Sequence, residues 1–160
     1  MKVLGIDVGT AITGWSILEK KSQIVKVIGY GVITTNKNLE MSERLLILFN
    51  ELNEIISTFK PDDMAVEELF FFKNSKTVIT VGQARGVILL AGVINKLNVV
   101  GYTPLQVKQA VTGYGRADKI QIQKMVKIIL KLDNIPKPDD AADALAIAIC
   151  HFNSVNLRKK

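Results

Sequence analysis

The sequence predicts an α/β fold in which helices flank a mixed, five-stranded sheet. Three segments near the N-terminus have strand composition and are separated only by short polar breaks. After them, segments with the 3.6-residue period of helices alternate with two short apolar runs. A strand meander followed by alternating helices and strands is typical of a mixed sheet with helices on its faces.

The expected strands are apolar or alternating runs bounded by turn residues. Residues 2–8 are apolar on both faces and end at Gly9-Thr10, which is typical of a strand in the middle of a sheet. The polar residues 20–23 separate the next two segments, which we interpret as a hairpin. The five strands are expected at residues 2–8, 13–20, 24–34, 63–68 and 98–102.

The expected helices show apolar residues at intervals of three and four. The clearest pattern begins at Ser42 and stops at Lys60-Pro61, because proline cannot continue a helix. The segment 75–96 contains small residues such as Gly82 and Gly86, which would let another element approach closely, either within the fold or across a dimer. Helices are expected at residues 42–59, 75–96, 104–111, 118–131 and 140–153.

Composition favours a single folded domain with an anionic partner. The chain has 160 residues, 48% of them apolar, so we expect one domain over residues 1–156 and a short basic tail at 157–160. The net charge is +6, from 21 Lys and Arg against 15 Asp and Glu, which favours partners such as nucleic acid. The single cysteine, Cys150, excludes an intramolecular disulfide and fits a reducing cytoplasm.

The sequence gives no indication of secretion or of a membrane span. Asp7 follows the start of the chain within a few residues, so we expect no signal peptide. The longest apolar stretch, Val87 to Ile94, is well short of the roughly 20 residues that a membrane-spanning helix needs. We therefore expect a cytoplasmic protein with no membrane contact.

Four carboxylates stand beside apolar segments. Asp7 interrupts a buried strand and Glu67 closes another apolar run, while Asp140 and Asp143 lie three residues apart at the start of an almost wholly apolar helix. A buried carboxylate is costly unless its charge is compensated. Oxygen ligands suit Mg²⁺ or Mn²⁺, and two such ions would activate water and stabilise the leaving alkoxide in phosphodiester cleavage. The quartet therefore suggests a shared site for two divalent ions.

Each of these acids also has a purely structural interpretation. Asp is favoured in the first turn of a helix, which would explain Asp140 and Asp143, and Asp139 alone could serve as the cap. Asp7 could begin a turn before Gly9. The sequence pattern leaves both interpretations open.

Two further ambiguities concern which side chains face the site. Glu67 and Glu68 are adjacent, and the two-residue period of a strand sends them to opposite faces of the sheet. No His and Cys cluster competes as a zinc site. The single His151 follows Asp143 by about two helical turns, so it would either support the site from behind or be structural.

Six short motifs follow one another along the chain: Gly5-Ile6-Asp7-x-Gly9, Ala65-Val66-Glu67-x-x-Phe70, Lys73-Asn74, Gly82-Gln83-Ala84-Arg85-Gly86, Gln106-Val107-Lys108-Gln109 and Asp140-Ala141-Ala142-Asp143-Ala144-Leu145-Ala146. In this order the chain resembles, over nearly its whole length, the RuvC Holliday junction resolvases, which have a ribonuclease H-like fold. One departure is Val8, where the family usually has proline. The first motif is also similar to YqgF-type relatives and actin-like sugar kinases, but the later motifs argue against both.

The resemblance implies a metal-dependent endonuclease. It implies that Asp7, Glu67, Asp140 and Asp143 are the catalytic, metal-binding acids, and so chooses Glu67 over Glu68. Likewise it chooses Asp140 over its neighbour Asp139. The expected cofactor is Mg²⁺, two ions per active site, with Mn²⁺ as a substitute. The implied substrate is four-way junction DNA, cut by a homodimer through paired symmetric nicks, with the RuvA–RuvB branch-migration complex as a partner in recombination and repair.

Basic and aromatic residues give the expected DNA surface. The resemblance implies that Lys108 and Lys119 hold DNA near the cleavage site and that Phe70 stacks on an unpaired base. Arg116, in the loop between those lysines, could contact phosphate, and Tyr114 could stack as Phe70 does. The expected DNA-binding residues are Phe70, Lys73, Arg85, Lys108, Arg116 and Lys119.

A second set of basic residues has two interpretations. Lys124, Lys127 and Lys131 recur at spacings of three and four, which would place them on one helical face. They would form either a solvated helix face or a phosphate contact.

Overall fold

The computed structural model describes residues 1–68 and 75–157. Within them a mixed sheet runs in the order β3-β2-β1-β4-β5. The central strand β1 (Lys2–Asp7) pairs in antiparallel fashion with β2 (Ile12–Lys21) and in parallel with β4 (Asp63–Glu67). The edges are β3 (Ile24–Thr34), antiparallel to β2, and β5 (Asn98–Tyr102), parallel to β4. The expected α/β fold with a mixed, five-stranded sheet is confirmed.

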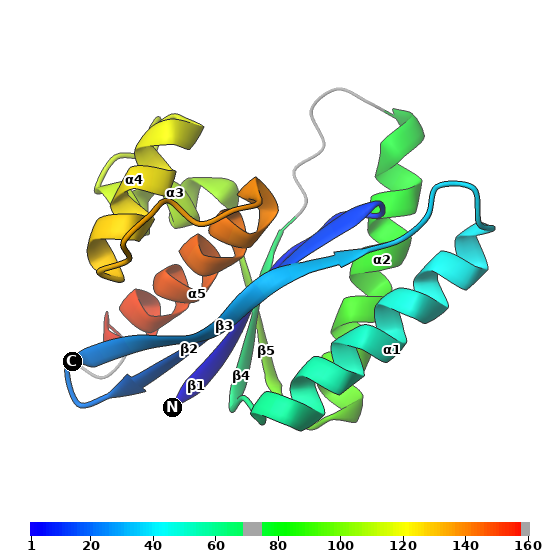
Figure 1. Cartoon of the computed structure of the whole chain (residues 1–160), viewed down its shortest axis with the longest axis horizontal. Helices are drawn as coiled ribbons and strands as arrows, with labels where there is room; N and C mark the ends of the chain where they lie inside the picture. The colour runs from blue at the N-terminus through cyan, green and yellow to red at the C-terminus, as the bar shows by residue number, and fades with distance from the viewer. Residues whose placement is uncertain (69–74, 158–160) are drawn as a thin grey trace.

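Helices cover both faces of this sheet (Figure 1). One face carries α1 (Met41–Phe59) and α2 (Ser75–Ile94). The other carries α3 (Pro104–Thr112), α4 (Lys119–Ile129) and α5 (Asp139–Leu157). The largest difference from the expected bounds is at the end of α5, which continues beyond residue 153.

Two hydrophobic cores fill the space between the sheet and its helices, and strand alternation divides the side chains between them. Ile6 of β1 lies in the core under α1 and α2, whereas Val3 lies in the core under α3, α4 and α5. Ala65 of β4 shares the core of Val3. Because side chains two residues apart in a strand point to the same face, Asp7 and Glu67 are directed toward α5.

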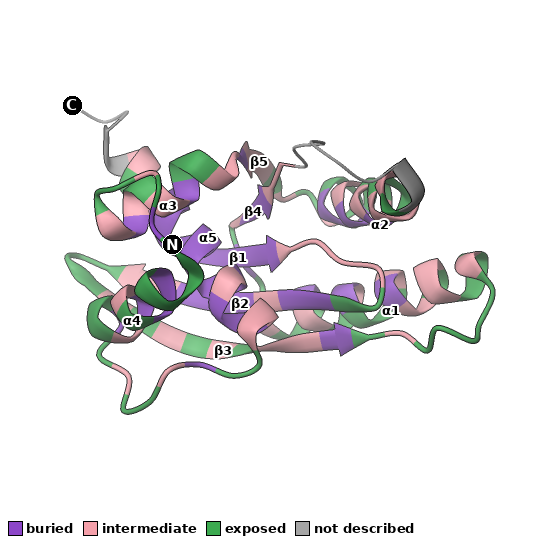
Figure 2. Ribbon diagram, turned by 90° about the horizontal axis from the view of Figure 1, so that it is seen from above, coloured by how far each residue is buried: buried purple, intermediate pink, exposed green. Residues whose placement is uncertain are grey.

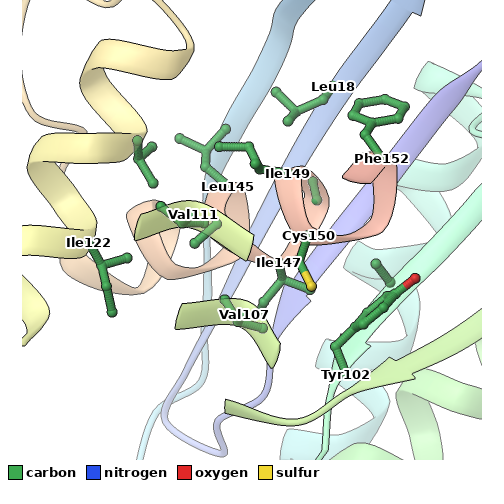
Figure 3. Packing of buried hydrophobic residues seen from close by; sticks show 14 of the residues in the cluster. Leu18, Tyr102, Val107, Val111, Ile122, Leu145, Ile147, Ile149, Cys150 and Phe152 are labelled. Carbon is green, nitrogen blue, oxygen red and sulfur yellow. The ribbon is translucent and has the colours of Figure 1, made fainter. Parts of the chain in front are cut away.

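The helix α5 is buried on all sides over much of its length. Every residue from Ala144 to Phe152 is buried, as the purple helix beside β1 in Figure 2 shows. Figure 3 shows residues of α3 and α4, such as Val107 and Ile122, packed against it. On the sheet side, a Cβ at Gly14 would overlap the carbonyl oxygen of Asp140. Helix α5 therefore lies directly on the backbone of the sheet.

The helix α2 has one packed side and one open side. Ala84, Ile88 and Ala91 are fully buried in the core with α1. The opposite side exposes large apolar residues: Ile79, Leu90, Val93 and Ile94. The small residues divide in the same way, since a Cβ at Gly92 would meet Val99 and Met64, whereas one at Gly82 or Gly86 would meet nothing within 4 Å.

The apolar length of α2 corrects one expectation. Its segment Thr77–Ile94 has the length and composition of a membrane span, with a mean hydropathy of 1.7, and 22% of it is buried. The expectation rested on the uninterrupted apolar run Val87–Ile94 and did not consider that residues 77–86 carry a single charge, Arg85. One such helix is only weak evidence for a membrane protein. The exposed apolar surface of α2 is a candidate for contact with another molecule.

Candidate active site

Three of the four predicted acids line one pocket at an edge of the sheet. Asp7 is the last residue of β1 and Glu67 the last of β4, and the parallel register of these strands places the two residues side by side. Asp143, from the start of α5, faces them across a pocket of about 200 Å³. The other lining residues are Pro104, Val107, Lys108, Lys119, Ile122 and Ala146.

The fourth acid, Asp140, lies one helical turn before Asp143 and outside the lining of the pocket. Its charge nevertheless contributes to raising the pKa of both Asp7 and Asp143, so it lies within electrostatic reach of the site. The neighbouring Asp139 is also absent from the pocket lining; one of its carboxylate oxygens pairs with Lys137 at 3.1 Å and the other with Lys119 at 3.5 Å. The hydrogen bond from Lys137 is the main reason why the pKa of Asp139 is lowered.

The two glutamates at the end of β4 also separate, as the strand period requires. Glu67 enters the pocket, whereas Glu68 packs over Gly101 of β5, where an added Cβ would lie 2.7 Å from Oε1 of Glu68. Gly101 pairs with Val66, which belongs to the core under α1 and α2. Glu68 is therefore on the face of the sheet opposite the pocket.

Burial and mutual repulsion shift the acids of the pocket strongly. Burial, followed by the charges of Glu67, Asp143 and Asp140, raises the pKa of Asp7 from 3.8 to about 7. Burial and then the charge of Asp143 raise the pKa of Glu67 from 4.5 to about 7. Burial is likewise the main reason why the pKa of Asp143 is raised. A bound cation would favour the ionised form of these carboxylates and so offset the cost of burying their charges together.

One cation of the protein already reaches the site. The Lys119 ammonium lies 3.3 Å from Oδ2 of Asp143 and 3.5 Å from Oδ2 of Asp139. Burial opposes the charged form of Lys119, but attraction and hydrogen bonding to Asp143, and then to Asp139, raise its pKa overall. Lys119 begins α4, whose N-cap Asp118 accepts a hydrogen bond from the Gln121 N–H at 2.8 Å. The cap orders the first turn of α4 and so holds the backbone of Lys119 where its side chain reaches Asp143 of α5.

The acids line a common pocket, but their side chains are not gathered into a compact set of metal ligands. Among residues 1–68 and 75–157, no three His, Cys, Asp or Glu side chains are arranged as tightly as a metal site. The donor set nevertheless fits a divalent ion: hard carboxylate oxygens, largely buried, with too few positive charges beside them.

The predicted DNA-binding residues are distributed over several elements. Lys108 and Lys119 line the pocket, and Arg116 is exposed in the loop that leads into α4. Arg85 belongs to α2, on the opposite face of the sheet, and its Nε is buried with no hydrogen-bond partner in the described part of the chain. Phe70 and Lys73 lie outside the described residues.

The structure also locates Tyr114 and the predicted lysine stripe. Tyr114 is 58% exposed in the loop between α3 and α4. The lysine stripe is incomplete, because α4 ends at Ile129 and Lys131 lies beyond it with a φ of 53°. Sequence reasoning also missed the apolar wall of the pocket, formed by side chains such as Val107 and Ile122. Their helical periodicity predicts burial but does not distinguish a pocket wall from a core.

Comparison with known proteins identifies the family. A sequence model of the family described as crossover junction endodeoxyribonuclease RuvC matches residues 3–151. The chain belongs to the RuvC family. It is 61% identical over 155 residues to the RuvC of Caldicellulosiruptor saccharolyticus, covering 96% of this chain and 93% of that protein. It is 58% identical over 160 residues to the RuvC of Halothermothrix orenii, covering 100% and 97% of the two chains.

Solved structures agree with this assignment. The chain resembles Thermus thermophilus RuvC in complex with a Holliday junction substrate, with a TM-score of 0.93, 34% identity and coverage of 99% of this chain and 96% of that one. It also shares its fold with the yeast mitochondrial Holliday junction resolvase Ydc2, at a TM-score of 0.68, 14% identity and coverage of 99% and 84%. The expected ribonuclease H-like fold of a RuvC protein is confirmed.

Proposed function

We propose that this chain is a structure-selective endonuclease that resolves four-way (Holliday) DNA junctions in recombination and repair. The observation that carries the proposal is the meeting of Asp7, Glu67 and Asp143 in one open pocket beside Lys119. Membership of a family of crossover junction endodeoxyribonucleases supports the reaction class. The solved complex of the 34% identical Thermus thermophilus RuvC with a Holliday junction supports the substrate.

The four carboxylates are proposed as the catalytic metal ligands: Asp7, Glu67, Asp140 and Asp143. Their donor chemistry suits two Mg²⁺ ions per active site, with Mn²⁺ as a substitute. When bound, such ions activate water and stabilise the leaving oxygen of a phosphodiester. Hydrolysis in this way would leave a 5′-phosphate and a 3′-hydroxyl.

The cationic residues around the pocket are proposed to hold the phosphate backbone. Lys119 restrains Asp143 through its ion pair, and its half-exposed ammonium can also meet a phosphate oxygen. Lys108 lines the same pocket, and the exposed Arg116 extends the positive surface along the loop before α4. Phe70 and Lys73, which follow Glu67 in the sequence, and Arg85 of α2 remain proposed DNA contacts.

The open side of α2 is proposed to form the homodimer interface. Ile79 and Val93 are 68% and 65% exposed there, next to the glycines that leave room for close approach. A twofold dimer would supply two active sites for two symmetric nicks. We also propose a cytoplasmic location, the RuvA–RuvB complex as a partner, and one nuclease domain over residues 1–156 with a basic tail at 157–160.

Nicking of a labelled synthetic junction tests this function. Wild-type protein should cut two opposing strands in Mg²⁺ and none in a chelator, and should leave linear duplex intact. Asp7→Asn should bind the junction without cutting it, whereas the exposed Asp133→Asn should behave as wild type. Binding without any cutting by the wild type would instead indicate a junction-binding protein that lacks nuclease activity.

A further inference from the structure

A polar network that takes no part in the proposed chemistry links α5 to β4 and β5. His151 of α5 has 0% relative exposure. Its Nε2 lies 2.7 Å from Oδ2 of Asp63, and its Nδ1 lies 3.0 Å from the hydroxyl of Tyr102. Burying polar groups this deeply is costly unless each is hydrogen-bonded. This network satisfies both ring nitrogens.

The donor and acceptor roles follow from the partners. A carboxylate accepts hydrogen bonds, so the Nε2–H of His151 donates to Asp63; in the neutral ring Nδ1 then accepts from the hydroxyl of Tyr102. The imidazole also meets the edge of the Tyr102 ring, with centroids 5.8 Å apart and planes at 85°. The ring of His151 is therefore held in one orientation between two strands.

The three residues connect the elements that carry the proposed metal ligands. Asp63 is the first residue of β4, the strand that ends at Glu67. Tyr102 ends β5 and pairs in register with Glu67, and its carbonyl accepts a hydrogen bond from the N–H of Glu68 at 2.8 Å. His151 lies on α5, about two turns beyond Asp143 and three beyond Asp140. The network thus joins α5 to the strand pair beside the pocket.

Directional bonds supplement the apolar packing that places α5 on the sheet. Where α5 lies on β1 the contact is made by small groups, since a Cβ at Gly5 would overlap the carbonyl oxygen of Ala144 and lie 3.0 Å from the Cβ of Ala148. Close contact of this kind sets the distance between helix and sheet, and hydrogen bonds of defined direction add to the constraint on translation and rotation. One such bond runs from the hydroxyl of Ser16 on β2 to the carbonyl of Ala144, at 2.8 Å. His151 supplies a second, seven residues farther along the helix.

We propose that the Asp63–His151–Tyr102 network is a positioning device that sets where α5 presents its two aspartates to the acids of β1 and β4. It would thereby set the affinity of the active site for divalent ions. The inference rests on the proposed function, because it takes those acids to be metal ligands. His151 is fully buried and does not line the pocket, so it is a positioning residue and not a catalytic one.

The test compares metal binding with stability in single variants. Tyr102→Phe removes one hydroxyl and keeps the ring, and Tyr30→Phe on β3 is the matched control because Tyr30 is 38% exposed. Mn²⁺ binding is measured by titration calorimetry without DNA, together with thermal unfolding and junction binding in a chelator. We expect the Mn²⁺ dissociation constant of Tyr102→Phe to rise about tenfold, as is typical for groups that support metal ligands. Junction binding and the control should stay within about twofold of wild type.

A second variant separates positioning from general destabilisation. His151→Gln keeps an amide donor for Asp63, so it should retain more Mn²⁺ affinity than His151→Leu, which keeps the volume but no donor. Mn²⁺ affinities equal to wild type in both Tyr102→Phe and His151→Leu would overturn the inference, whatever happens to the melting temperature. Wild-type protein that neither binds Mn²⁺ nor nicks junctions would overturn the proposed function and the inference with it.

Discussion

Asp7→Asn should stabilise the metal-free protein while abolishing its activity. In the folded protein, burial and then the neighbouring acids raise the pKa of Asp7 from 3.8 to about 7. Each pKa unit corresponds to about 1.4 kcal/mol, so ionised Asp7 lowers the free energy of unfolding by about 4 kcal/mol. An uncharged amide of the same shape avoids this cost. We therefore expect that the buried acids needed for metal binding lower the free energy of unfolding of the metal-free protein.

The pH dependence gives the sign of this effect. Between pH 3.8 and about 7, folded Asp7 keeps its proton while unfolded Asp7 has lost it. The free energy of unfolding therefore falls as the pH rises through this window and levels off above it. Asp7→Asn removes this contribution, so its advantage should be small at pH 4 and full at pH 8. Glu67, whose pKa is also raised to about 7, adds a decline of the same sign that the variant retains.

Urea unfolding in a chelator at pH 4 and pH 8 measures the difference. The exposed Asp133→Asn is the matched control and should match wild type at both values. Saturating Mg²⁺ should stabilise wild type and close the gap at pH 8, because a ligand that binds only the folded state shifts its stability. If Asp7→Asn is no more stable than wild type in the chelator at pH 8, the electrostatic description of the pocket is wrong.

Three further variants probe the surroundings of the site. Lys119→Met should change stability by less than about 1 kcal/mol, because exposed ion pairs contribute little, but should slow junction cleavage at least tenfold in a single-turnover assay; unchanged cleavage would count against its phosphate role. Gly14→Ala should destabilise by about 1–3 kcal/mol in thermal unfolding, because the new Cβ would overlap the carbonyl oxygen of Asp140; a melting temperature equal to wild type would contradict this packing. Leu90→Glu on the open side of α2 should give a monomer in sedimentation analysis and unpaired nicks, and a persistent dimer would place the interface elsewhere.

Local sequence patterns predicted the positions of the strands and most of the residues of the site. The apolar run around Asp7 indicates a central strand, and the two-residue period separates Glu67 from Glu68 without deciding which of them faces α5. That choice depends on the parallel register of β4 with β1, a contact between segments about sixty residues apart. The resemblance to RuvC supplied the choice, and the structure places Glu67 in the pocket with Asp7.

Other features depend on long-range contacts that a local pattern does not carry. His151 meets Asp63 across a sequence separation of 88 residues, and neither partner is marked by a motif. The predicted helix 118–131 was too long, since α4 ends at Ile129. The spacing of the lysines continues past this end and therefore does not mark it. The small residues of α2 left packing within the fold and packing across a dimer both open, and only the structure shows that Gly92 lies on the packed side and that Gly82 and Gly86 lie on the open side.

Strand cleavage of a four-way junction in Mg²⁺ tests the central claim most directly. The substrate is a synthetic junction with each strand labelled in turn, and wild type is compared with Asp143→Asn, whose carboxylate lines the pocket opposite Asp7. Wild type should make paired nicks in two opposing strands, and Asp143→Asn should bind the junction with similar affinity and leave all four strands intact. Paired nicking by Asp143→Asn at the wild-type rate would contradict the assignment of this pocket as the active site.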